Sequence, residues 1–122
     1  MIYHRLIYGE KMKNSQLPLS EQTYFILLSL QSEPKHGYAI AKDIQSLSKG
    51  RVTLSVSTLY TTLKRLLDDG WIRLLDEVPQ GPGKPRKIYE ITRKGGNVLV
   101  SEIQRLNTLV SAARLQGVEG IS

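Results

Sequence analysis

The middle of the chain predicts an amphipathic helix followed at once by two short strands. Leucines recur there at helical spacing, and either Ser55 or Ser57 can cap the start of the helix. Gly70 stands where a left-handed residue ends a helix. Residues 71–75 and 87–91 then have the length and apolar content of strands. A lone helix and hairpin of this size cannot bury their apolar faces, so further helices must cover them.

Two helices precede this unit and one follows it. The first is capped by Ser20, ends near Gln31 and is apolar nearly all the way round. Such a helix is covered on more than one side, and a second subunit is one candidate for that cover. The second helix begins at Gly37 and is stopped by residues 48–50. The last helix begins after Thr92, which can cap it.

The last helix carries a narrow apolar stripe with alternating spacings of four and three residues. This is the pattern by which one helix packs along another. We expect the stripe to join two copies of the chain, because few intrachain elements are left to cover a terminal helix. Packing of the stripe onto its own domain is the alternative. Its residues are Leu99, Ile103, Leu106, Val110 and Ala113.

The face of the third helix opposite its leucines is polar. It is formed by hydroxyl and basic residues. Short hydroxyls can approach phosphates or base edges closely, and Lys and Arg add charge and forked donors. The face therefore suits a polyanion groove, although a solvated helix face has the same composition. At 100° per residue, this face holds Ser57, Thr58, Thr61, Lys64 and Arg65, with Tyr60 at its border.

The turn between the two strands concentrates positive charge on a slim backbone. Lys84, Arg86 and Lys87 stand among Gly and Pro residues, as in a wing that follows phosphates or enters a minor groove. A basic turn that aids solubility or protects an edge strand is the alternative. The order of elements predicts a mainly α fold with a small β-hairpin, namely a winged helix-turn-helix domain plus a C-terminal dimerisation helix.

Composition narrows the classes of function. The 122 residues carry a net charge of +6 and no cysteine, which fits one domain with polyanion partners and excludes disulfides and thiolate sites. No apolar run is long enough to span a bilayer, so we expect a soluble, cytoplasmic protein. His36, Asp68 and Asp69 lack neighbours at catalytic or metal-ligand spacing. We therefore expect no enzymatic activity, no metal and no cofactor. We interpret His36 as setting the start of the second helix, and contact of exposed N–H groups in this turn with a phosphate is the alternative.

Three segments resemble the PadR-like family of transcriptional regulators, and together they cover most of the chain in the family order. They are PKHGYAI at 34–40, STLYTTLKRL with DGWI at 57–72, and KPRKIYEITRKG at 84–95. The resemblance implies a homodimeric winged-helix repressor of the family's short C-terminus branch. In it the third helix enters the major groove, the hairpin is the wing and the last helix joins the subunits. It also implies that Tyr60 and Lys64 lie near the DNA backbone.

Two features depart from the family pattern. One is the N-terminal arm, and the other is Trp71, which stands where an aliphatic residue is common. Family members that bind drugs or phenolic compounds stack aromatic side chains on them, so a small aromatic or hydrophobic effector is implied by resemblance alone. We expect Trp71 to anchor the first strand to the core instead.

These patterns divide the chain into four parts. Residues 1–16 form an N-terminal arm to which no order is assigned, and 17–92 form the winged helix-turn-helix domain. Residues 93–116 form the dimerisation helix and 117–122 a tail. The expected function is sequence-specific binding of double-stranded DNA at a pseudo-palindromic operator, with repression relieved by an effector. A winged-helix module that binds another protein, without specific DNA binding, is the alternative.

Overall fold

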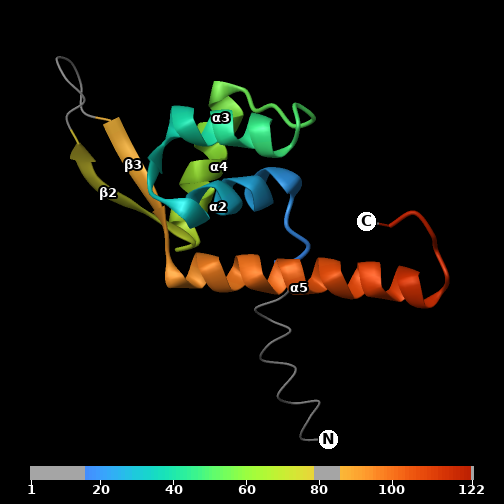
Figure 1. The fold of residues 1–122 in the computed structure, drawn as a ribbon. Helices are drawn as coiled ribbons and strands as arrows, with labels where there is room; N and C mark the ends of the chain where they lie inside the picture. The colour runs from blue at the N-terminus through green and yellow to red at the C-terminus, as the bar shows by residue number, and fades with distance from the viewer. Residues whose placement is uncertain (1–15, 79–85, 122) are drawn as a thin grey trace, which may run out of the picture.

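The computed structural model describes residues 16–78 and 86–121. The elements along these residues are α2 (Glu21–Ser32), β1 (Lys35–His36), α3 (Gly37–Leu47), α4 (Val56–Asp68), β2 (Ile72–Val78), β3 (Arg86–Ile91) and α5 (Arg93–Leu115). Helices α2, α3 and α4 pack together, the hairpin of β2 and β3 extends from one end of this group, and α5 runs along its base (Figure 1). The predicted mainly α, winged helix-turn-helix fold with a long C-terminal helix is confirmed.

Three helices begin at the hydroxyl residues expected from the sequence. Ser20, Ser55 and Thr92 each accept a hydrogen bond from the backbone N–H three residues further on, at 3.1, 3.2 and 3.1 Å. Ser55, not Ser57, is therefore the cap of α4. At the other end of α4, Gly70 has a φ of +76°, which is the left-handed conformation expected there.

The sheet contains one strand more than the sequence predicted. Within the described residues it has three antiparallel strands in the order β1-β3-β2, so the expected hairpin is widened by β1. Lys35 pairs with Tyr89 and His36 with Ile88. A strand of two residues has no periodicity to detect, which explains why it was missed. The pairing places His36 beside the first residues of β3.

The core lies where α2 meets the other elements. Its buried apolar side chains come from helices α2 to α5, from β2 and β3, and from the residue before β2. Trp71 is 3% exposed, so it anchors the start of β2 in the core as expected. The nearly uniform apolar surface of α2 is covered from within the chain by α3, α5 and β3. The core residues are Ile26, Leu27, Leu30, Ile40, Ile44, Leu59, Leu63, Leu66, Trp71, Ile72, Tyr89 and Leu99.

The apolar stripe of α5 is divided between two environments. Leu99 is 3% exposed and belongs to the core, and Ile103 packs partly against it. Leu106 and Val110 are exposed at 37% and 38%, and Ala113 is half-buried. The expectation that the whole stripe faces a second copy is therefore wrong for Leu99, because the first half of α5 packs on α2.

A buried carboxylate fixes the same half of α5 to the segment before α2. Glu102 is 3% exposed, and its Oε2 accepts a hydrogen bond from the Leu19 backbone N–H at 3.1 Å. Its Oε1 accepts from Arg105 Nε at 2.6 Å. The hydrogen bond from Arg105 is the main reason that the pKa of Glu102 lies below its usual value, and it outweighs the raising effect of burial. A buried charge paired in this way holds α5 in one position on the domain.

Candidate nucleic-acid interface

The polar face predicted for α4 exists and is open. Ser57, Thr58, Thr61 and Lys64 are exposed, whereas Leu59, Thr62, Leu63 and Leu66 are buried on the opposite side. Thr58 takes part in the cap, because its hydroxyl accepts a hydrogen bond from Ser55 Oγ at 2.9 Å. Thr61 and Lys64 make no side-chain hydrogen bond to any part of the chain that the structure describes. The central and C-terminal part of this face is therefore free to contact another molecule.

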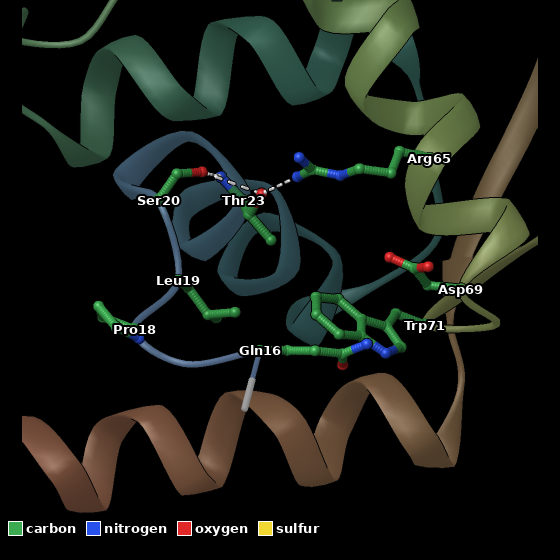
Figure 2. Close-up of a pocket in the computed structure, with 8 residues that line it drawn as sticks. All are labelled: Gln16, Pro18, Leu19, Ser20, Thr23, Arg65, Asp69 and Trp71. Carbon is green, nitrogen blue, oxygen red and sulfur yellow. Dashed lines mark hydrogen bonds between the residues drawn. The ribbon is translucent and has the colours of Figure 1, made fainter. Parts of the chain in front are cut away.

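Arg65 is also exposed, but its side chain binds to α2. Its Nη2 donates a hydrogen bond to Thr23 Oγ1 at 2.7 Å, so the side chain extends from α4 toward the start of α2 (Figure 2). Its guanidinium therefore connects α4 to α2, and the contact of Arg65 with DNA stays a prediction.

Arg65 also lines a small pocket of about 280 Å³ beside the core. Figure 2 shows Pro18, Leu19 and Ser20 on one side of this pocket and Arg65, Asp69 and Trp71 on the other, with the Gln16 side chain extending toward Trp71. Trp71 Nε1 is buried without a hydrogen-bond partner among the described residues. The pocket belongs to the packing of α4 against the segment before α2, and it lies apart from the exposed face of α4.

The first two residues of β3 are exposed and basic. Arg86 and Lys87 form no ion pair with a carboxylate in residues 16–78 or 86–121 whose side chain the structure describes. Lys84, the third predicted wing residue, lies outside the described residues. The observed part of the predicted wing thus offers two cations to a partner.

A groove of about 400 Å³ connects the start of β3 with α3 and α4. Its lining residues are His36, Gly37, Tyr38, Tyr60, Arg86 and Lys87. Tyr60 reaches into it from α4 because Gly37 has no side chain: a Cβ there would lie 2.6 Å from Tyr60 Oη. The sequence predicted Tyr60, Arg86 and Lys87 in the interface and a phosphate contact at the turn of residues 36–38 as an alternative, but it did not predict the contact of His36 with Arg86. His36 lies there because β1 pairs with β3, and a strand as short as β1 leaves no pattern in the sequence from which this pairing could be predicted.

His36 has the structural role expected from the sequence. It caps α3, where its Nδ1 accepts a hydrogen bond from the Ala39 backbone N–H at 3.3 Å. Burial lowers the pKa of His36 below its usual value, and the positive charge of Arg86 lowers it further. Both effects favour the neutral form of the imidazole.

Neither a metal centre nor a membrane span is found in the described residues. No group of three His, Cys, Asp or Glu side chains among them is arranged to hold a metal ion. None of the helices in residues 16–78 and 86–121 combines the length and apolar character needed to cross a bilayer. The described site consists of hydroxyl, imidazole and cationic groups on an exposed surface.

The fold is similar to that of many solved structures, of which three are described. A PadR family transcription regulator from Clostridium difficile has a TM-score of 0.66 and 25% identity, covering 79% of this chain and 97% of its own. A PadR-like transcription factor from Bacteroides fragilis has a TM-score of 0.65 and 26% identity. The match covers 91% of this chain and 98% of the Bacteroides chain. Bacillus subtilis PadR in complex with operator DNA has a TM-score of 0.60 and 27% identity. The match covers 66% of this chain and 46% of the Bacillus chain.

The sequence itself matches one protein family. The pattern of the PadR-like transcriptional regulators matches residues 26–101, from within α2 to the first half of α5. No curated protein sequence matches significantly. The family match extends over more than half of the chain and includes the helix-turn-helix and the described strands of the wing. This chain therefore belongs to the PadR-like family of transcriptional regulators.

Proposed function

We propose that this protein represses transcription by binding a pseudo-palindromic operator in double-stranded DNA as a homodimer. The observation that carries the proposal is the open polar face of α4, together with the groove in which Tyr60 of α4 meets the cations of β3. Helices of this kind enter the major groove, where short hydroxyl side chains reach base edges. Similarity to the Bacillus subtilis PadR complex with operator DNA supports the same use of the fold.

The residues of the proposed interface have different tasks. Ser57 and Thr61 lie nearest the bases, because they stand at the centre of the exposed face of α4. Thr58 lies at the edge of this face, where its capping role limits it to contacts near the helix start. Lys64 binds phosphate beside them. Arg86, Lys87 and Lys84 hold the wing along the DNA backbone.

The proposed dimer uses the second half of α5. Leu106, Leu109, Val110 and Leu115 are exposed there at 37%, 56%, 38% and 86%, which is unusual for large apolar side chains on one helix end. Ala113 and the outer side of Ile103 complete the surface. Two-fold symmetry through this surface pairs two α4 helices, so operator half-sites are separated by about one helical turn of DNA, roughly 34 Å, or a multiple of it.

Relief of repression by a small aromatic or hydrophobic effector is part of the same proposal. Its support is family membership and the exposed apolar surface of α5. That surface also fits a second function, in which the domain binds another protein and its charge is incidental. The two functions differ in how binding responds to salt, since contacts with DNA phosphates release counterions.

Selection of duplexes from a random pool tests the proposal. We expect enrichment of an inverted repeat, and binding to it that weakens linearly on a log-log plot against salt, with a slope near −0.9 for each phosphate contacted. Absence of enrichment together with a flat salt response would favour the protein-binding function. Analytical ultracentrifugation of the same sample gives the oligomeric state.

A further inference from the structure

His36 makes two contacts that one protonation state cannot satisfy together. Its Nδ1 lies 3.3 Å from the Ala39 backbone nitrogen, and its Nε2 lies 3.1 Å from Arg86 Nη1. Both neighbouring nitrogens are donors. A neutral imidazole accepts a hydrogen bond at one ring nitrogen and donates at the other, and the protonated ring accepts at neither. One of the two contacts is therefore between two N–H groups.

The helix cap decides which contact keeps its hydrogen bond. Nδ1 accepts from Ala39 because the first N–H groups of α3 have no partner inside the helix. Nε2 then carries the hydrogen and faces the guanidinium of Arg86. Two donors at 3.1 Å repel each other unless an acceptor lies against both.

Among the described residues, no carboxylate lies against these two donors. The groove beside them is lined by Tyr60 and Lys87 as well, and no carboxylate is among its lining residues. The four ion pairs that the structure describes use Lys35, Arg51, Arg73 and Arg105, so Arg86 is not neutralised by any of them. Donors from three elements thus converge on a space of about 400 Å³ without a negative group.

We propose that this groove binds one backbone phosphate of the operator, with a non-bridging oxygen accepting hydrogen bonds from His36 Nε2 and Arg86 together. Lys87 and the Tyr60 hydroxyl face the same phosphate from β3 and α4. The bound oxygen removes the conflict between the two donors and leaves the cap of α3 intact. This inference rests on the proposed DNA binding and adds a fixed position for one phosphate at the junction of wing and helix-turn-helix.

The variants His36→Asn and Arg86→Ala separate the two donors. Asparagine caps helices well, so His36→Asn keeps the start of α3 but removes the ring Nε2–H. We expect each variant to weaken binding to the selected operator about tenfold, as for one hydrogen bond to a charged group. The slope against salt is expected to flatten by about 1 for Arg86→Ala and to stay unchanged for His36→Asn, because only the arginine carries charge. Thermal melting checks that both variants fold.

The two donors are also expected to depend on each other. Because they share one oxygen, the double variant should lose less affinity than the product of the two single losses. Losses that multiply, in variants that melt like the parent protein, would show that His36 and Arg86 bind separate groups and would overturn the shared site.

Operators with one methylphosphonate at a time locate the phosphate. The parent protein should lose about tenfold at one phosphate in each half-site, and the same substitution should cost His36→Asn little. Equal losses for both proteins at every position would contradict the proposal. A parent protein that binds no duplex at all would reject the proposed function itself. If inorganic phosphate then still shifts the His36 ring ¹⁵N resonances, the groove takes free phosphate and not DNA.

Discussion

The two halves of α5 have similar apolar residues but opposite surroundings. From Arg93 to Ile103 the helix lies against α2 and contributes Leu99 to the core. From Leu106 to Leu115 it extends past the domain with its leucines and valine exposed. The first half is therefore needed for the fold of one chain, whereas the second half is not. An apolar stripe continued beyond its own core points to a surface that another molecule covers.

The largest expected effect on the free energy of unfolding comes from shortening the buried Leu99 side chain in the first half of α5. Leu99→Ala should lower the free energy of unfolding by about 3 kcal/mol, since it removes buried methyl groups and leaves a cavity. Leu109→Ala on the same helix is the matched control and should cost under about 0.5 kcal/mol in dilute protein, because Leu109 is 56% exposed. Urea denaturation measures both. Equal losses would remove the difference between the two halves.

The start of α5 is also closely packed. A Cβ on Gly95 would lie 2.0 Å from the Trp71 carbonyl oxygen, which itself accepts a hydrogen bond from the Thr92 N–H. Gly95→Ala should therefore cost about 2 kcal/mol or more. Gly96→Ala is the control, since nothing lies within 4 Å of its Cβ position, and it should stabilise the helix by about 0.5 kcal/mol. A melting temperature that changes alike in both variants would contradict the close approach.

The contribution of Glu102, in the first half of α5, to the free energy of unfolding should depend on pH. Glu102→Gln should cost about 1.5 kcal/mol at pH 7, because it loses the charge-assisted hydrogen bond from Arg105. The pKa of Glu102 is lowered in the folded chain, so its contribution is present above the usual value of 4.5 and is lost as pH falls through the folded pKa. Urea denaturation at pH 7 and at pH 3 should show the gap between variant and parent protein narrowing in acid. A gap that stays constant would mean that the carboxylate charge contributes nothing.

The smallest effect on folding is expected in the second half. Val110→Glu should change the free energy of unfolding of the monomer by under about 0.5 kcal/mol, because the side chain is exposed at 38% and stands past the core. It should nevertheless dissociate the proposed dimer, since a charge cannot be buried against an apolar partner. Sedimentation velocity separates the two results. A dimer that survives would place the contact between subunits elsewhere.

Local signals explain what the sequence could predict. The caps at Ser20, Ser55 and Thr92 and the left-handed Gly70 depend on residues a few positions away, so their geometry follows from the sequence nearby. The same holds for the exposed face of α4. The periodicity of its leucines identifies the buried side, and the opposite side follows from the helical repeat.

Contacts between distant parts of the chain explain what the sequence could not predict. The helical repeat places Arg65 on the polar face beside Lys64, but it does not show that Thr23 lies close enough to accept its hydrogen bond. The stripe on α5 has one period throughout, and only the position of α2 decides that Leu99 is core while Val110 is not. His36 meets Arg86 only because β1 pairs with β3. Each of these depends on tertiary packing that no short segment encodes.

The length of α5 has a mechanical consequence. Its 23 residues form one continuous helix of roughly 35 Å, fixed at the start by Leu99 and Glu102. Because α5 is fixed to the domain at one end and carries the proposed subunit contact at the other, a change of its angle at that contact moves the whole domain. A tilt of about 6° at the far end displaces the domain by roughly 3.5 Å, close to one base-pair step of about 3.4 Å. Any molecule that changes the angle between the two α5 helices of the proposed dimer would change the half-site spacing that the dimer can bind.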